Sequence, residues 1–100
     1  MYEKYAPSIT SIDGLKSFLS FFFKDSDVEV FLFGSRASGK SIHTSDIDLA
    51  FLSNADISYK LSALREILDN SNLLQKVDLI DLKNAPSLKN IVKSEGIRWI

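Results

Sequence analysis

Apolar residues in the first third of the chain are spaced as expected for a helix followed by a buried strand. From Ile9 to Phe23 they recur at three- and four-residue steps, which indicates a helix with one apolar face. After a polar turn, the run from Val28 to Phe33 is almost continuously apolar and rich in residue types that favour strands. Such a run is typical of a central strand covered on both faces, and it ends at Gly34.

The middle of the chain predicts a second strand, a helix and a third strand. The segment from Asp46 to Leu52 alternates as a strand with two different faces does. Asp56 is a candidate N-cap for a helix whose apolar stripe continues to about Asn70. The segment from Val77 to Leu82 then predicts the third strand.

The end of the chain predicts one more helix and a short apolar tail. The helix should begin at Pro86 and end at Gly96, a natural C-terminal stop. Its inward face should carry three apolar residues: Leu88, Ile91 and Val92. The tail, residues 97–100, should form an edge strand or a docked end. Trp99 and Ile100 either contact a partner or cap the protein's own core, and the sequence leaves both interpretations open.

These elements predict an α+β fold, a small mixed β-sheet with helices packed on it, in the order α-β-(turn)-β-α-β-α. The first two strands are joined by a short link, so we expect them to be antiparallel. The second and third are joined through a helix, which favours a parallel crossover.

Length, composition and charge narrow the class of protein. A chain of 100 residues predicts a single domain spanning 1–100, and the net charge of −1 gives no support for broad nucleic-acid binding. The chain contains no cysteine, which excludes disulfides, a thiol nucleophile and thiolate zinc sites and suits a cytoplasmic location. We expect no signal peptide and no membrane span, because the apolar run 18–23 is far shorter than the about 20 residues required.

The predicted topology gathers aspartates at one end of the sheet. In an antiparallel pair, Gly34 at the end of the first strand lies near Asp46 at the start of the second. A third strand parallel to the second brings Asp78 near Asp46 and Asp48, whereas Asp81 points to the opposite face. Carboxylates so close repel one another unless a cation intervenes, and oxygen ligands suit Mg²⁺ or Mn²⁺. Two such ions would stabilise the attacking and leaving oxygens of a displacement at phosphorus.

The turn after the first strand suits a phosphate. Gly34 lets the backbone approach closely, Ser35 offers a hydroxyl and an N–H, and Arg36 and Lys40 could neutralise phosphate charge. Each feature alone has a simpler explanation, since a Gly-Ser pair after a strand is most often just a turn and Arg36 could belong to an ion pair. His43 is more consistent with a bystander than a catalyst. The features of this turn coincide with the aspartates at one end of the sheet, and this coincidence favours the functional interpretation.

The same turn matches a rival pattern. Residues 34–41 fit G-x-x-x-x-G-K-[ST], the P-loop pattern, after an apolar strand. A P-loop Lys-Ser opens a long helix, however, whereas residues 41–45 carry no helical stripe and a new strand is expected by Asp46. The magnesium-binding Asp of a P-loop enzyme usually closes its strand, whereas the candidate aspartates here open theirs. A P-loop nucleotide-binding protein is therefore the less favoured alternative.

The combined motif resembles that of a known family. Gly34-Ser35, ten residues and then Asp46-Ile47-Asp48 resemble the G-S-x(10)-D-x-D signature of the DNA polymerase β-like nucleotidyltransferases. Residues 34–39 and 45–50 are similar to the minimal nucleotidyltransferases (MNT proteins) of bacteria and archaea. Residues 77–80 resemble their third-carboxylate strand, and residues 91–97 resemble their closing helix.

This resemblance implies a nucleotidyltransferase fold and a metal-dependent reaction. Asp46 and Asp48 would bind the metals, two Mg²⁺ ions or Mn²⁺, while Asp78 would share a metal and favour deprotonation of the attacking hydroxyl. Gly34 and Ser35 would hold the triphosphate. The reaction implied is transfer of a nucleoside monophosphate, AMP from ATP, to a hydroxyl with release of pyrophosphate.

The resemblance also implies a partner. Proteins of this size are often encoded beside an all-helical HEPN protein, and the MNT protein then resembles the antitoxin of a toxin–antitoxin pair, with a tyrosine of the HEPN toxin as acceptor. A non-catalytic antitoxin that neutralises its helical partner by contact is the alternative. Because 100 residues offer little surface to grip a base or an acceptor, a partner chain or a second copy in a homodimer could complete the cleft.

Overall fold

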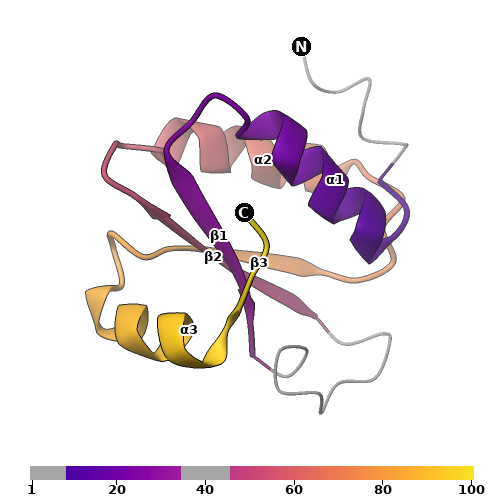
Figure 1. The fold of residues 1–100 in the computed structure, drawn as a ribbon. Coiled ribbons are helices and arrows are strands. Elements are labelled where there is room, and N and C mark those ends of the chain that lie inside the picture. The colour runs from indigo at the N-terminus through magenta and orange to yellow at the C-terminus, as the bar shows by residue number, and fades with distance from the viewer. Residues whose placement is uncertain (1–8, 35–45) are drawn as a thin grey trace.

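The computed structural model describes residues 9–34 and 46–100. Its elements form a mixed sheet covered by helices on both faces (Figure 1). In chain order they are α1 (Ile12–Phe22), β1 (Val28–Phe33), β2 (Ile47–Ser53), α2 (Ser58–Asp69), β3 (Val77–Asp81), the 3₁₀ turn η2 (Pro86–Leu88), α3 (Lys89–Glu95) and β4 (Ile97–Arg98). The α+β prediction is confirmed, with β4 added at the end.

The sheet has the strand order β3-β2-β1-β4. As predicted, β1 and β2 are antiparallel, with Phe33 opposite Asp48. The β2–β3 pair is parallel, also as predicted, and Asp48 is aligned with Asp78. The C-terminal end of β1 and the N-terminal ends of β2 and β3 therefore lie at the same end of the sheet.

The larger core lies between the sheet and the pair α1 and α2. Ser11 caps α1, since its Oγ accepts a hydrogen bond of 3.0 Å from the Gly14 N–H. The apolar stripe of α1 and the inward residues of β1, β2 and α2 pack into one cluster, whose fully buried members include Leu15, Leu19, Val30, Leu49, Phe51 and Leu64. This core is apolar, and it fixes the register of β2. A one-residue slip of β2 would turn the aspartates of that strand into the core.

The smaller core lies on the opposite face, under α3. It contains Phe31, Ala50, Leu82 and Val92. Gly96 ends α3, and a Cβ there would lie 2.5 Å from the Val92 carbonyl oxygen and 3.1 Å from that of Leu32. Only glycine therefore allows the chain to leave α3 so close to β1.

The C-terminal tail is both an edge strand and a docked end. β4 pairs antiparallel with β1, and the Trp99 N–H then donates to the Val30 carbonyl oxygen at 2.8 Å. The Ile100 carbonyl oxygen accepts from the Val30 N–H at 3.3 Å. Trp99 and Ile100 are half-buried against the larger core, so they cap the protein's own core.

Two local predictions are wrong. Ile91 was expected inward with Val92, but 52% of its surface is exposed. Asp56 was expected as the N-cap of α2, but Ile57 holds that position. The Asp56 Oδ1 instead accepts hydrogen bonds from the Ser58 N–H at 2.9 Å and the Ser58 hydroxyl at 2.7 Å, which satisfies the first turn from one residue further back.

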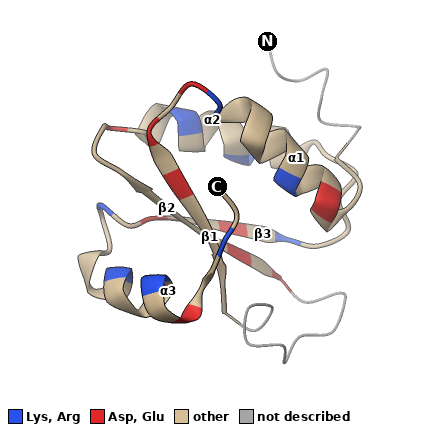
Figure 2. Ribbon diagram, viewed as in Figure 1, with Lys and Arg blue, Asp and Glu red and all other residues tan. Residues whose placement is uncertain are grey.

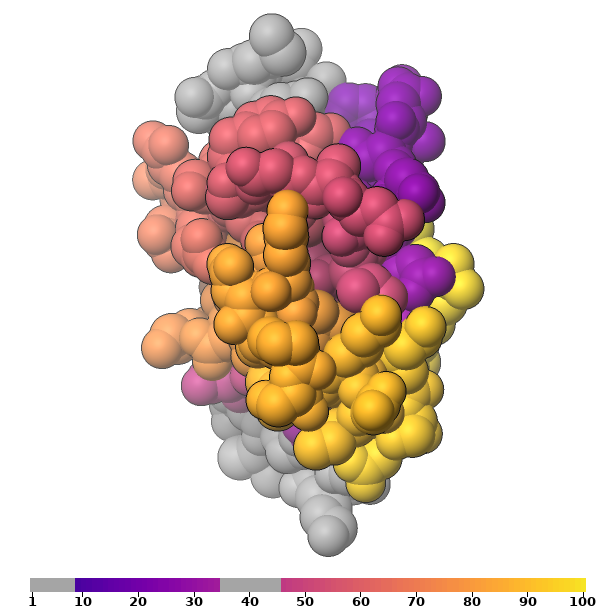
Figure 3. Space-filling view, turned by 90° about the vertical axis from the view of Figure 1, so that its left-hand side faces the viewer, coloured from indigo at the N-terminus to yellow at the C-terminus, as the bar shows by residue number. Residues whose placement is uncertain are grey.

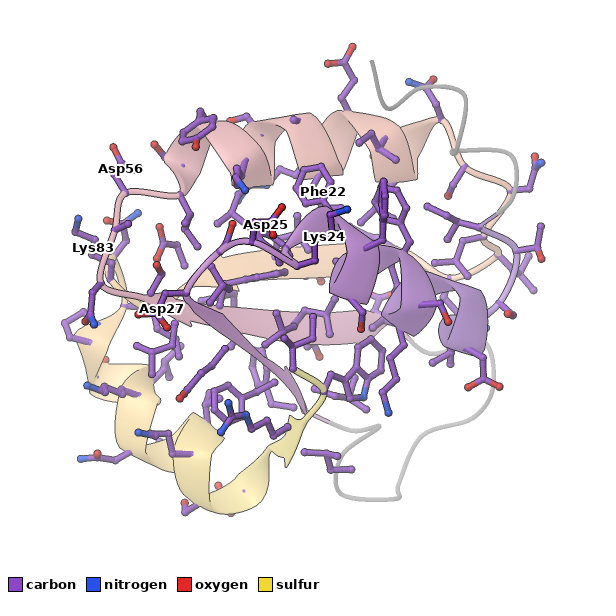
Figure 4. All side chains as sticks on the ribbon, turned by 45° about the horizontal axis from the view of Figure 1, so that its top comes forward. Phe22, Lys24, Asp25, Asp27, Asp56 and Lys83 are labelled. Atoms are coloured by element: carbon purple, nitrogen blue, oxygen red, sulfur yellow. The ribbon has the colours of Figure 1, made fainter. Side chains whose placement is uncertain are left out.

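Asp56 lies at the end of the sheet remote from Gly34, near Lys83 (Figure 4). Its hydrogen bonds from Ser58 and, more weakly, the Lys83 charge lower its pKa. Figure 3 views the molecule from this end, with α2 above and the segment after β3 and α3 below.

In the part of the chain that the structure describes, no helix is long and apolar enough to cross a membrane.

Candidate active site

The central feature of the candidate site is a pair of carboxylates on adjacent strands. Asp48 of β2 and Asp78 of β3 are aligned in the parallel register, so they share the face of the sheet that α3 covers. Both are half-buried, and they are close enough for the Asp78 charge to act on Asp48. Figure 2 shows acidic positions of β2 and β3 at the same end of the sheet.

Asp81 lies elsewhere, as the topology predicted. It is aligned with Phe51, whose side chain belongs to the larger core, so it points to the opposite face from Asp78. Its Oδ1 accepts a hydrogen bond of 3.0 Å from the Lys83 N–H. Asp81 therefore closes a turn and does not join the carboxylate pair.

The carboxylate pair carries electrostatic strain. The pKa of Asp48 is raised above its ordinary value of 3.8, first by partial burial, then by repulsion from Asp78 and from Asp46, and by the hydrogen bond with Asp78. The ionised form of Asp48 is thus disfavoured in the folded chain. A cation bound beside the carboxylates would relieve this strain, and perturbed pKa values of this kind are typical of functional sites.

Gly34 lies directly against this pair. Its φ angle is +79°, in the left-handed region that favours glycine. A Cβ at this position would overlap Oδ2 of Asp48 and lie 3.3 Å from Cγ of the same residue. The predicted proximity of Gly34 to the second strand is thus a contact, and it depends on the missing side chain.

Asp46 occupies a looser position than its two partners. It precedes β2, is exposed and acts on Asp48 through its charge. Within residues 9–34 and 46–100, no three His, Cys, Asp or Glu side chains are arranged as a metal-binding group. The donor set present is therefore a close carboxylate pair with a third carboxylate nearby, a chemistry that fits a hard divalent cation.

Three of the predicted phosphate-binding residues, Ser35, Arg36 and Lys40, lie outside the described residues, as does His43. β2 begins at Ile47. A strand therefore begins six residues after Ser41, whereas a P-loop Lys-Ser is followed by a long helix. The structure thus gives the P-loop interpretation no support.

Two basic residues near the pair were missed by the sequence reasoning. Lys76 Nζ lies 3.6 Å from Asp78 Oδ1, and both side chains are substantially exposed. Arg65 of α2 donates to the Leu79 carbonyl oxygen at 3.3 Å. The signal for Lys76 was its spacing, since residues two apart on a strand share a face, whereas Arg65 depends on how α2 packs.

A cavity of about 590 Å³ borders the pair on the side of β3. Asp48 and Asp78 line it, together with Lys76 and Arg65. Because β3 is the outermost strand of the sheet, this cavity is reached from the sheet edge. The arrangement can hold a cation between the carboxylates and admit a second molecule beside Asp78.

Comparisons with known proteins agree with this arrangement. A family model described as "Polymerase beta, Nucleotidyltransferase" matches residues 19–98. A crystal structure of a toxin–antitoxin with AMP-PNP is similar to this chain, with a TM-score of 0.60 and 26% identity over 85% of this chain and 72% of that chain.

A second crystal structure shares the fold. It is the toxin–antitoxin MntA–HpeT carrying two Asp-to-Glu substitutions, with a TM-score of 0.58 and 23% identity over 85% of this chain and 71% of that chain. No curated protein sequence gives a significant match. The family model covers most of the chain, and the fold agrees with it; the chain belongs to the polymerase β nucleotidyltransferase family.

Proposed function

We propose that this protein is a metal-dependent nucleotidyltransferase that transfers AMP from ATP to a hydroxyl of an all-helical HEPN partner and acts as the antitoxin of that pair. The observation that carries the proposal is the contact between Gly34 and Asp48, with Asp78 aligned beside Asp48. A bare backbone turn and two strained carboxylates adjoin at one point, where a triphosphate and its cations would be held together.

Asp48 and Asp78 would hold the cation, with Asp46 as a further ligand. When bound, Mg²⁺ neutralises phosphate charge and polarises the phosphorus that is attacked. The chain's own contribution is the geometry: the parallel register sets two carboxylates side by side, and β2 and β3 are rigid elements on which such groups stay in position.

Gly34 and Ser35 would bind the triphosphate, and Arg36 and Lys40 would neutralise its charge. At Gly34 the absence of a Cβ keeps the Asp48 carboxylate clear. The same absence lets a phosphate oxygen approach the backbone. The nucleotide would therefore lie toward β1, on the opposite side of Asp48 from Asp78.

The acceptor would then approach from β3. Gly34, directly after β1, contacts Asp48 of β2, and Asp48 is aligned with Asp78 of β3. The cavity of about 590 Å³ opens at the outer edge, beside β3. The acceptor oxygen attacks the α-phosphorus, the bond from that phosphorus to the pyrophosphate oxygen breaks, and the hydroxyl proton passes to the Asp78 carboxylate. Lys76, paired with Asp78 at 3.6 Å, would help to keep that carboxylate in position beside the acceptor.

The partner is proposed from two considerations. The chain resembles crystal structures that are toxin–antitoxin complexes. The catalytic face is also open at the β3 edge, so another protein could supply the hydroxyl there. An antitoxin that acts by contact alone would use the same surface without the carboxylates.

The test is label transfer from [α-³²P]ATP with Mg²⁺ to the helical protein encoded beside this chain. The wild-type protein should label the partner, and Asp48→Asn should abolish labelling while still binding the partner. Transfer that persists in Asp46→Ala/Asp48→Ala would contradict the enzymatic proposal. Neutralisation of the toxin by that double variant, without label transfer, would favour the contact mechanism.

A further inference from the structure

A second and smaller cavity lies beside Gly34, between the end of β1 and α3. Its volume is about 240 Å³, and it is lined by Phe33 at the end of β1, by Gly34 directly after it, and by Ile91 and Glu95 of α3. Phe33 is aligned with Asp48, and Gly34 contacts the Asp48 carboxylate. The cavity therefore begins where the proposed phosphate site ends.

The lining of this cavity combines apolar walls with one carboxylate. Phe33 is half-buried at the margin of the smaller core, while Ile91 is 52% exposed and belongs to neither core. Ile91 and Glu95 are four residues apart, so they share one face of α3. Among the described residues, Glu95 takes part in no ion pair.

The size of the cavity limits its occupant. Pockets that enclose a drug-sized ligand measure about 300–1,000 Å³, so 240 Å³ suits one heteroaromatic ring system and not a whole nucleotide. A flat ring would use the apolar walls of Phe33 and Ile91. The Glu95 carboxylate can only accept hydrogen bonds when ionised, so the ring must bring an N–H donor.

We propose that this cavity receives the nucleobase of the triphosphate and selects a base that bears an exocyclic amino group. This inference rests on the proposed function. Phe33 and Ile91 contact the ring, and Glu95 accepts a hydrogen bond from the amino group. The sugar and phosphates extend past Gly34 toward Asp48. A base without the amino donor cannot form this hydrogen bond, so it binds more weakly than a base that has the donor.

The experiment compares two nucleotides that differ by the amino group. Calorimetry with Mg²⁺ measures binding of ATP and of purine riboside triphosphate, which lacks the 6-amino group. Glu95→Ala should weaken ATP binding about tenfold, the effect of losing a hydrogen bond to a charged group, and leave purine riboside triphosphate unchanged. Ile91→Ala should weaken binding of both nucleotides about fivefold through lost apolar contact.

Two matched variants control for charge and for apolar surface. Glu66→Ala removes an exposed carboxylate from α2, and Ile97→Ala shortens an exposed isoleucine outside the cavity. Both should bind ATP as the wild type does. Thermal unfolding of all four variants checks that each is folded.

Each outcome decides something. Wild-type binding of ATP with no effect of Glu95→Ala or Ile91→Ala would overturn the base site and leave the proposed function standing. Equal weakening of both nucleotides by Glu95→Ala would also overturn it, because the loss would then not depend on the amino group. Failure of the wild type to bind any triphosphate with Mg²⁺ would contradict the proposed function, and the base site with it.

Discussion

Replacing Gly34 with alanine tests the contact between the β1 turn and the carboxylate pair. The new Cβ would sit on a backbone with φ of +79° and overlap Oδ2 of Asp48. The backbone strain costs about 1–2 kcal/mol. The overlap adds about 1–3 kcal/mol, as overpacking does elsewhere. Gly34→Ala should therefore lower the free energy of unfolding by about 2–5 kcal/mol.

The overlap can be separated from the backbone strain by a double-mutant cycle. Asp48→Ala removes the carboxylate that the new Cβ would meet, so in that background Gly34→Ala should cost only the about 1–2 kcal/mol of strain. The coupling between the two positions should then be about 1–3 kcal/mol, within the range for residues in contact.

Urea unfolding of the four proteins measures this coupling directly. In thermal unfolding, each kcal/mol should correspond to about 4–8 °C for a domain of this size. The rate of transfer by Gly34→Ala should fall even where the protein is fully folded, because a shift of about 1 Å in a catalytic group can reduce the rate about 100-fold. Additive effects of Gly34→Ala and Asp48→Ala, or no cost of Gly34→Ala, would refute the contact.

Three further predictions concern charge and ligands. The pKa of Asp48 is raised in the folded chain, so the folded state loses stability as the pH rises above 3.8, the ordinary pKa of this group. Asp48→Asn should therefore raise Tm at pH 7, and this gain should vanish below about pH 3.8. At 100 times its Kd, Mg²⁺ should add about 2.7 kcal/mol to the free energy of unfolding of the wild type and so raise its Tm. It should hardly change the Tm of Asp48→Asn, and an equal rise in both proteins would place the ion elsewhere. Asp46→Ala should weaken ATP binding with Mg²⁺ more than Lys40→Ala does, and the reverse order would revive the P-loop alternative.

Sequence patterns were sufficient to predict the three main strands and to place Asp78, and not Asp81, beside Asp48. β1 has the predicted bounds, Val28–Phe33, because its apolar run is bounded by polar residues and Gly34. The crossover rule made β2 and β3 parallel, and the parallel register alone selected Asp78 over Asp81. These features follow from connection length and a two-residue period, which the sequence contains in full.

Features that depend on tertiary packing were not predictable in the same way. α3 has only seven residues, so one apolar row, centred on Val92, is enough to cover the smaller core, and Ile91 is left at the surface. The pairing of Lys76 with Asp78 depends on side-chain reach, and the burial that raises the pKa of Asp48 depends on the assembled sheet. Period and propensity contain none of this information.

If the Asp48–Asp78 pair carries out nucleotidyl transfer, as proposed above, β3 offers an internal comparison. Asp78→Asn and Asp81→Asn make the same chemical change three residues apart on one strand, on opposite faces of the sheet. With [α-³²P]ATP, Mg²⁺ and the partner protein, Asp81→Asn should transfer label at the wild-type rate, and Asp78→Asn should lose transfer by at least about 100-fold, as expected for loss of an acid–base group. Equal rates of transfer for the two variants would contradict the role proposed for Asp78.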